Sequence, residues 1–574
     1  MKKLILASTL ILFLLSFQMA GCDKSEDTVV SIPSAPDITL NSGYSQDELE
    51  KAVQSCGGGC DTGTATITDN EDGTYTVACN GDVDAITATG SINIVQQKVA
   101  PEIEWSPCQF EIPEGQTVKC GYLIVPEDRS QPDGTSIRLH FAVFKSKSDS
   151  PAPDPIVYLE GGPGVSALKQ ISQSMNLRFS PFLENRDFIV FDQRGTGYSE
   201  PALDCPEIID YFYTNLNEVP SEEQSRYHFE ACLQCRERLI SDGVNLAAYN
   251  SAESAADLND LRIALGYERW NLYGISYGSR LALTAMRDYP EGIRSVILDA
   301  PVPLQSNLYV DRPANIDRAF DVFFEGCAAD SSCHRAYSDL ENVFWELVDR
   351  LNKSPITFSV NHPQTGKTYD VLMDGDSLVD LISISMYSTE NTRFLPGLIY
   401  QIRGGTYGNL PIAMGAYLTT LEMMSMGMNY SVICNEEVSF TTPEELSEAI
   451  NSYPKFKGLF SSYSDPDYNV CALCQKWNAG EADPIENEPV YSDIPALVLA
   501  GEYDVILSPS SSCLAAETLI NSYYYEFPGV GHGAIVSGRE CPLNIALDFL
   551  NDPTLEPDAS CIKDMGGVNF FIFF

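Results

Sequence analysis

The chain has 574 residues, and its 35 Lys and Arg against 80 Asp and Glu give a net charge of −45. Binding of nucleic acid needs a basic surface that neutralises phosphates, so this charge excludes nucleic acid as an expected partner. The hydrophobic content of 44% is that of a globular protein, and the length is sufficient for one large α/β domain with insertions.

The first 22 residues have the pattern of a secretory signal. Lys2 and Lys3 precede an apolar run from Leu4 to Phe17, which is too short to span a bilayer. Met19-Ala20-Gly21-Cys22 follows, and small residues before a cysteine resemble a bacterial lipobox, in which the cysteine becomes the lipidated first residue. We therefore expect an exported lipoprotein that is anchored to a membrane through Cys22, either facing the periplasm or at the cell surface.

The cysteines indicate a disulfide framework. The chain has 17 of them, and setting Cys22 aside leaves an even number, which in an exported protein is typical of structural bridges. Two CxxC pairs, Cys232/Cys235 and Cys471/Cys474, could instead serve zinc or redox chemistry. Neither pair follows a predicted strand as a thioredoxin motif does, so bridging is the preferred interpretation, with the connectivity left open.

Residues 23–100 are rich in Ser, Thr, Gly and Asp and poor in large apolar side chains. Thr64–Thr68 and Thr74–Ala78 alternate in polarity around an acidic segment, which predicts a β-hairpin. The acidic segment lacks the spacing of a calcium-binding EF-hand loop, so we interpret it as a turn. The region is predicted to be a small cysteine-containing module or spacer.

From Ile103 onward, buried strands alternate with helices, which predicts a doubly wound, mostly parallel sheet. The predicted strands are Ile137–Phe144, Asp154–Leu159, Asp187–Phe191, Arg294–Leu298, Ile494–Ala500 and Tyr523–Phe527, and the clearest helix is Ser251–Leu265.

Pro301–Val490 interrupts this alternation and has the position and helical character of a cap inserted into the sheet domain. Its helix candidates are Phe320–Phe324, Val343–Leu351 and Met414–Met426. The expected divisions are a signal peptide (1–22), the small module (23–100), the first part of the sheet domain (101–300), the cap (301–490), the C-terminal part of the sheet domain (491–562) and an apolar tail of no assigned role (563–574).

The segment from Leu272 to Ser279 reads as a strand, then Gly-Ile-Ser-Tyr-Gly, then the start of a helix. This is the pattern of the nucleophile elbow of α/β-hydrolases, in which a tight turn lifts the serine hydroxyl out of the sheet. The turn leaves room only for small neighbours, here Gly274 and Gly278, and the helix N-terminus offers amide groups to an oxyanion. Ser276 is therefore the predicted nucleophile.

A serine nucleophile needs a base, and an acid that orients the base. Of the five histidines, only His532 lies in a Gly-His-Gly loop after the last predicted strand, where the hydrolase order Ser, Asp, His places the base. Asp504 follows the preceding strand and is the predicted acid. Asp299, at the end of an earlier strand, is the alternative acid.

Oxyanion donors are expected on Gly161-Gly162-Pro163-Gly164, which follows an early strand, because glycines let backbone N–H groups approach a substrate oxygen. We assign the oxyanion hole to the N–H groups of Gly162 and Tyr277. Asp192–Gly197 is interpreted as a structural, Arg-anchored turn in the wall of the site.

Five motifs together resemble the prolyl iminopeptidase and tripeptidyl aminopeptidase family of α/β-hydrolase serine peptidases. They are Gly-Gly-Pro-Gly, Asp-Gln-Arg-Gly-Thr-Gly-Tyr-Ser, Gly-Ile-Ser-Tyr-Gly, Gly-Glu-Tyr-Asp and Pro-Gly-Val-Gly-His-Gly, within a match from Ile103 to Cys561. Glu160 departs from the family, since iminopeptidases often have His before Gly-Gly-Pro-Gly. The resemblance implies release of one amino acid or a tripeptide from a free peptide N-terminus through an acyl-enzyme, without metal or cofactor.

An aminopeptidase must also recognise the substrate α-ammonium group, which calls for carboxylates near the cap. Glu436 and Glu437 are the candidates. Two other functions stay open: a carboxylesterase or lipase on the same fold, because fold and triad do not determine the leaving group, and a non-catalytic lipoprotein that binds peptides through the cap.

Overall fold

The computed structural model describes residues 64–69, 75–80, 101–218, 222–460 and 465–573. The chain divides into two units, Met1–Ala100 and Pro101–Phe574. In the first unit, β1 (Thr64–Asp69) pairs antiparallel with β2 (Tyr75–Asn80), which confirms the strands of the predicted hairpin. The predicted signal peptide, Cys22 and the turn between the two strands lie outside the described residues.

The second unit is built on a nine-stranded sheet with the order β13-β12-β9-β8-β6-β7-β5-β4-β3 in the described part of the chain. The strands from β13 to β7 run parallel, while β5, β4 and β3 form an antiparallel edge. The prediction of a mostly parallel sheet is confirmed. The bounds are β3 Glu102–Ser106, β4 Val118–Pro126, β5 Ser136–Phe144, β6 Ile156–Leu159, β7 Phe188–Phe191, β8 Trp270–Ile275, β9 Ile293–Asp299, β12 Ala496–Gly501 and β13 Ser522–Phe527.

Helices cover both faces of this sheet, because successive side chains of a strand point to opposite sides. Leu272 of β8 belongs to a buried cluster with α5 and α6, whereas its neighbour Tyr273 belongs to a cluster with α2 and α19. Both side chains are fully buried, and each such burial contributes about 2 kcal/mol. The helices are α2 Ala167–Ser174, α5 Ser251–Leu265, α6 Tyr277–Asp288, α18 Pro509–Ala516 and α19 Glu540–Asn551.

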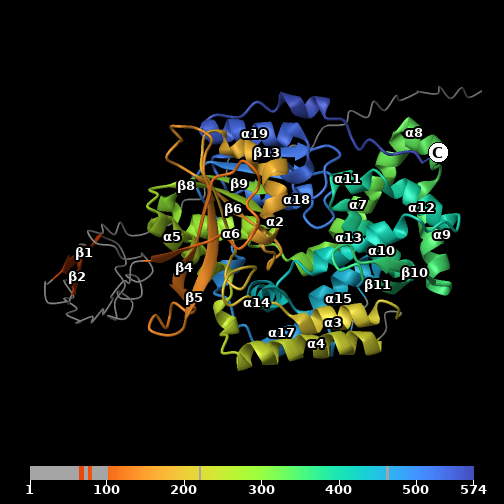
Figure 1. Ribbon diagram of the computed structural model, residues 1–574, viewed down its shortest axis with the longest axis horizontal. Coiled ribbons are helices and arrows are strands. Elements are labelled where there is room, and N and C mark those ends of the chain that lie inside the picture. Colours follow the sequence, from red (N-terminus) through yellow and green to blue (C-terminus); the bar gives the residue numbers. More distant parts are fainter. Residues whose placement is uncertain (1–63, 70–74, 81–100, 219–221, 461–464, 574) are drawn as a thin grey trace, which may run out of the picture. The chain divides into compact units, whose positions relative to one another are not determined.

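A helical cap follows β9, at the right and below the sheet in Figure 1. Its helices are α7 Leu308–Ala329, α8 Ser331–Ala336, α9 Leu340–Lys353, α10 Gly375–Met386, α11 Thr389–Thr392, α12 Leu395–Arg403, α13 Leu410–Leu421, α14 Met426–Glu436, α15 Pro443–Ser452 and α17 Val470–Trp477. Among the described helices, none is long and apolar enough to cross a membrane.

The cap contains elements that were not assigned to it from the sequence. An antiparallel hairpin, β10 (Ile356–Asn361) and β11 (Thr368–Met373), lies among its helices. In addition, α3 (Pro206–Asn215) and α4 (Glu222–Ser241) precede the elbow in the chain but share the buried core of the cap, with α4 packed against α17. Figure 1 shows α3 below α15, and α4 at the lower edge of the picture.

The predicted helix Met414–Met426 is wrong as a single element, because α13 ends at Leu421 and α14 starts at Met426. A tertiary contact explains the break: Ser425 donates its N–H to the carbonyl of Gly164 at 2.8 Å. Asn429 of α14 also donates, from Nδ2, to the carbonyl of Pro163 at 2.9 Å. The start of α14 is thereby fastened to the Gly-Gly-Pro-Gly loop.

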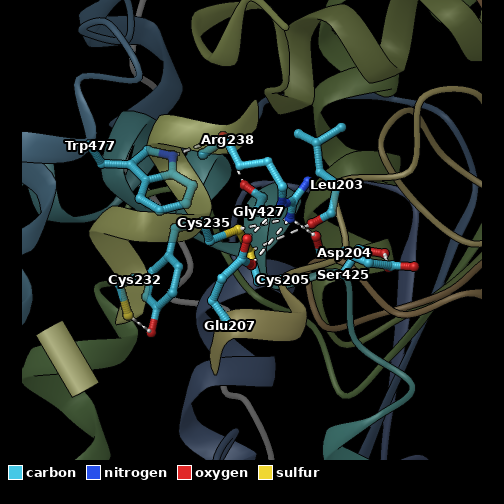
Figure 2. Close-up of a disulfide and its surroundings, with 12 residues drawn as sticks. Leu203, Asp204, Cys205, Glu207, Cys232, Cys235, Arg238, Ser425, Gly427 and Trp477 are labelled. Carbon is cyan, nitrogen blue, oxygen red and sulfur yellow. Dashed lines mark hydrogen bonds and ion pairs between the residues drawn. A yellow bond between two sulfur atoms is a disulfide. The ribbon is translucent and has the colours of Figure 1, made fainter. Parts of the chain in front are cut away.

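Disulfides are present in both the sheet domain and the cap of the second unit, which confirms the predicted disulfide framework. Figure 2 shows the bridge from Cys205 to Cys235 beside Arg238, which also pairs with Glu207 at 2.6 Å. The described bridges are Cys108–Cys120, Cys205–Cys235, Cys327–Cys333, Cys434–Cys474 and Cys541–Cys561.

Neither CxxC pair is bridged internally. Cys235 and Cys474 each pair with a cysteine distant in sequence, so Cys232 and Cys471 are left as buried thiols. Cys232, labelled in Figure 2, lies in the same region as the bridge, and its Sγ donates to the hydroxyl of Tyr430 at 3.5 Å.

Candidate active site

Ser276 occupies the turn between β8 and α6 with φ 54° and ψ −128°. Positive φ is strained for a residue other than glycine and persists only where the surroundings enforce it. A Cβ on Gly278 would lie 2.0 Å from the carbonyl oxygen of Leu159, and one on Gly274 would lie 2.3 Å from that of Gly278. Only glycines fit both positions, as the elbow pattern predicts.

Asp504 follows β12 and His532 follows β13, and the two side chains meet. Oδ2 of Asp504 lies 2.7 Å from Nδ1 of His532. Its Oδ1 accepts the N–H groups of Ile506 and Leu507 at 2.9 and 3.0 Å. The fully buried carboxylate therefore has one oxygen held by its own loop and the other directed at the imidazole.

The cap holds the histidine loop from the other side. The backbone N–H of His532 donates to the backbone carbonyl of Tyr387 at 2.9 Å. The rings of the two residues lie 4.7 Å apart between centroids. Burial alone would lower the pKa of His532, but the charge of Asp504 and its hydrogen bond outweigh burial and raise that pKa above its usual value. An imidazole in this setting accepts a proton more readily than one in water.

Asp299 supports the same loop without contacting the imidazole. Its carboxylate accepts the N–H groups of Ala534 and Ile535 at 2.6 and 3.0 Å, and the hydroxyl of Tyr273 at 3.2 Å. Burial raises the pKa of Asp299 to about 6. Of the two candidate acids, the structure places Asp504 against the histidine and Asp299 beneath the segment that follows it.

Ser276, His532 and Gly162 line one cavity of about 760 Å³ between the sheet and the cap. Gly162 has φ 115°, and Tyr277 is the first residue of α6, where backbone N–H groups have no acceptor within the helix. The two predicted oxyanion donors therefore lie on the loop that follows β6 and at the N-terminus of α6, directly after Ser276. The cap wall of the cavity is mainly apolar and includes Leu381, Ile384, Leu395, Leu398, Ile412 and Ala413.

Glu160 also lines this cavity, and among the described residues that line it Glu160 carries the only carboxylate. Its oxygens accept the N–H of Gly161 at 2.9 Å and the hydroxyl of Tyr158 at 3.0 Å. Burial raises the pKa of Glu160. The sequence shows this residue only as a departure from a familiar motif, with no sign that its charge faces the cavity.

Comparison with known proteins gives the family. A family model for the alpha/beta hydrolase fold matches residues 154–373, and one described as TAP-like protein matches residues 461–561. The chain is an α/β hydrolase with a TAP-like C-terminal domain. The predicted resemblance is thereby confirmed as distant homology to tripeptidyl aminopeptidase and to the serine protease Hip1.

The relatives of this hydrolase carry names of two activities. It is 28% identical to serine protease Hip1 of Mycobacterium tuberculosis over 52% of this chain and 59% of that protein. It is 30% identical to tripeptidyl aminopeptidase of Streptomyces lividans over 39% of this chain and 42% of that protein. Less than two thirds of either relative is therefore covered. Identity to carboxylesterase B of M. tuberculosis is 24%, over 80% of this chain and 89% of that protein.

The hydrolase does not bring Glu436 and Glu437 to its cavity, contrary to the expectation of an ammonium site there. Glu436 is buried and accepts Nε of Arg280 at 3.2 Å and the hydroxyl of Ser251 at 2.6 Å. Glu437 is buried beside it, and burial raises the pKa of Glu437 to about 7. Neither residue is among those that line the cavity of Ser276, and the carboxylate of Glu436 is instead bound by Ser251 of α5 and Arg280 of α6.

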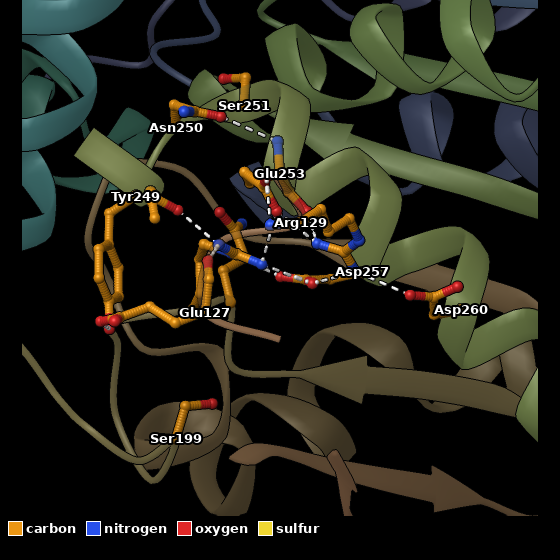
Figure 3. A network of polar contacts seen from close by, with 12 residues as sticks. Glu127, Arg129, Ser199, Tyr249, Asn250, Ser251, Glu253, Asp257 and Asp260 are labelled. Atoms are coloured by element: carbon orange, nitrogen blue, oxygen red, sulfur yellow. Dashed lines mark hydrogen bonds and ion pairs between the residues drawn. The ribbon is translucent and has the colours of Figure 1, made fainter. Parts of the chain in front are cut away.

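The segment Asp192–Gly197 is an Arg-anchored turn, as expected. Arg194 is fully buried and donates from Nε and Nη2 to Asp257 of α5 at 2.7 and 2.8 Å. Arg129 binds the same carboxylate at 2.7 Å and lies among Glu253, Asp257 and Asp260 in Figure 3. Gln193, which precedes Arg194, donates from Nε2 to the carbonyl of Glu160 at 3.0 Å, and this bond links the turn to the cavity wall.

Proposed function

We propose that this hydrolase is a serine exopeptidase that releases residues from free peptide N-termini through an acyl-enzyme. The observation that carries the proposal is the Asp504–His532 pair, of which His532 lines the same cavity as Ser276. Ser276 Oγ attacks the carbonyl carbon while His532 takes its proton, and Asp504 holds the imidazole in position. The N–H groups of Gly162 and Tyr277 stabilise the oxyanion. His532 then protonates the leaving amine, and water repeats the sequence to release the acyl group.

Glu160 is the proposed acceptor of the substrate ammonium group, in place of Glu436 and Glu437. It belongs to the loop that carries Gly162, so its carboxylate lies near the acyl part of a bound substrate. A partly buried carboxylate with a raised pKa gains from a nearby cation, because the cation offsets the unfavourable desolvation of its charge. An N-acetylated peptide has no such cation and loses this interaction.

The similarity to serine protease Hip1 and to tripeptidyl aminopeptidase supports a peptidase. The second candidate is a carboxylesterase, favoured by the apolar cap wall of the cavity and by the extent of the match to carboxylesterase B. A triad on this fold serves either leaving group, so the substrate must be tested directly.

The test is hydrolysis of a fluorogenic panel by the chain from Asp23 onward, with Ser276→Ala as the control. The panel holds Pro-, Ala- and Ala-Ala-Pro amides, free and N-acetylated, and a short-chain ester. Cleavage of free-amine amides that is lost on acetylation and in the variant establishes the aminopeptidase and its step length. Cleavage of the ester alone assigns a carboxylesterase, and no turnover leaves a peptide-binding lipoprotein.

We also propose that the protein is exported and anchored through a lipid on Cys22, so that it acts on peptides outside the cytoplasm. The support is the signal-like segment before Cys22, together with the disulfides of the second unit, since such bridges persist in oxidising compartments.

A further inference from the structure

The C-terminal strap, residues 567–573, starts against the loop that carries His532. A Cβ on Gly529 would lie 2.6 Å from the carbonyl carbon of Gly567 and 2.7 Å from the nitrogen of Val568. Val568 is buried, and so is Phe570, whose ring lies 6.1 Å from that of Phe323 of α7. The strap therefore leaves the sheet domain at the histidine loop and runs onto the cap.

Two hydrogen bonds donated by backbone N–H groups hold the end of the strap on the cap. Phe571 donates its N–H to the carbonyl of Arg393 at 2.9 Å, and Phe573 donates to the hydroxyl of Tyr337 at 2.8 Å. The rings of Phe571 and Phe573 lie 5.1 Å apart between centroids, and that of Phe394 lies 5.3 Å from Phe571. The end of the strap thus has a defined position.

Gly397 of α12 provides the seat for the ring of Phe573. A Cβ at position 397 would lie 2.0 Å from Cδ2 and 2.2 Å from Cε2 of Phe573. Glycine is disfavoured inside a helix, by about 1 kcal/mol relative to alanine, so its presence here fits the close approach of the ring.

The ring of Phe573 faces the active site. Phe573, Phe394, Leu395 and Leu398 line the same cavity as Ser276 and His532. By contrast, Phe571 is 42% exposed and is not among the residues that line the cavity. Only one of the two neighbouring aromatic rings of the strap therefore contacts the space that a substrate would fill.

We propose that Phe573 is a specificity-determining residue: its ring closes the apolar cap end of the cavity and limits the length of the acyl group that the site accepts. This rests on the proposed function only in that Ser276 is the nucleophile, whichever leaving group is used. Removal of the ring opens space beside Leu395 and Leu398, where a longer apolar group can bury its surface.

The experiment measures kcat/KM of the full chain for p-nitrophenyl esters from acetyl to decanoyl. Phe573→Ala should shift the decanoyl-to-acetyl ratio upward by about 10-fold, since a few methylenes buried in an apolar pocket have this effect. Gly397→Ala, which displaces the ring from its seat, should shift the ratio in the same direction. Phe571→Ala is the matched control, and Gly408→Ala adds a methyl group with no atom within 4 Å; both should keep the wild-type ratio.

An unchanged ratio in Phe573→Ala, in a protein that folds and hydrolyses the esters, would overturn the inference and leave the proposed function intact. An equal shift in Phe571→Ala would also overturn it, because the effect would then come from the strap as a whole. If the wild-type chain shows no Ser276-dependent hydrolysis of any ester or amide, the proposed function fails first and this inference falls with it.

Discussion

Oδ2 of Asp504 lies 2.7 Å from Nδ1 of His532, while Oδ1 of the same carboxylate is held by two backbone N–H groups. One oxygen therefore orients the imidazole, while the other is fixed by the backbone and keeps the carboxylate in place. Asp504→Asn keeps the shape of the side chain but removes the charge that stabilises an imidazolium. We expect kcat to fall by roughly 10³–10⁴-fold, measured on whichever substrate the panel identifies.

Asp299→Asn is the matched control for this loss, because Asp299 anchors the loop after His532 without contacting the ring. Asp299→Asn should lower the melting temperature of the protein, while kcat stays near the wild-type value. If Asp299→Asn abolishes turnover while Asp504→Asn keeps it, the assignment of the acid is wrong.

The pH dependence of activity should follow His532. The base must be neutral to accept a proton from Ser276, and its pKa is raised above 6.5. The acid limb of kcat/KM should therefore lie above pH 6.5 and move to lower pH in Asp504→Asn, where the carboxylate charge is gone. For stability the sign is opposite: the contribution of this pair is complete below pH 6.5 and is lost as pH rises through the raised pKa. A limb well below 6.5 in the wild-type chain would contradict the raised pKa.

The preference for substrates with a free α-ammonium group should depend on the carboxylate of Glu160. Glu160→Gln is expected to raise KM for free-amine peptides by about 10-fold or more, while KM for N-acetylated peptides or esters stays near the wild-type value. Tyr158→Phe removes a hydroxyl that binds Glu160 but keeps its charge, so the preference for free amines should survive in this control. Equal effects of Glu160→Gln on both kinds of substrate would exclude ammonium recognition.

Replacement of Glu436 by Gln should destabilise the protein, whereas replacement of Glu437 by Gln should stabilise it near neutral pH. Glu436→Gln weakens a fully buried ion pair with Arg280, and loss of one partner from such a pair costs about 3–5 kcal/mol. Glu437 has a carboxylate oxygen without a hydrogen-bond partner among the described residues. Its pKa of about 7 against an ordinary 4.5 means that stability falls as pH rises between these values.

Glu437→Gln should therefore raise the free energy of unfolding near neutral pH by on the order of 3 kcal/mol and have little effect near pH 4. Urea denaturation at both pH values checks this. A destabilised Glu437→Gln at neutral pH would show that its charge is compensated.

Lipid attachment should depend on Cys22. Labelling of expressing cells with a palmitate analogue should mark the wild-type chain, and Cys22→Ala should lose the label and pass from the membrane fraction to the soluble fraction. Cys56→Ala is a control for a nearby cysteine that does not follow the signal-like segment. Label retained in Cys22→Ala would reject the anchor.

Features set by neighbouring residues could be predicted from the sequence. The elbow around Ser276 depends on glycines two positions away, and Gly531-His532-Gly533 follows its strand directly. Features set by distant contacts could not. The break before α14 depends on Gly164, the pairing of Cys235 depends on Cys205, and Glu436 faces Arg280 rather than a substrate. Likewise, no local pattern shows that α3 and α4 join the core of the cap or that Phe573 reaches the cavity.

Two hydrogen bonds join the start of α14 to the proposed oxyanion loop, so the two segments should move together. They run from Ser425 to the carbonyl of Gly164 and from Asn429 to that of Pro163. A cap that swung open at this edge would drag Gly162 away from Ser276 and dismantle the site as it admitted the substrate. We therefore expect substrate to enter along another margin of the cap, where the walls can separate while these two hydrogen bonds stay intact.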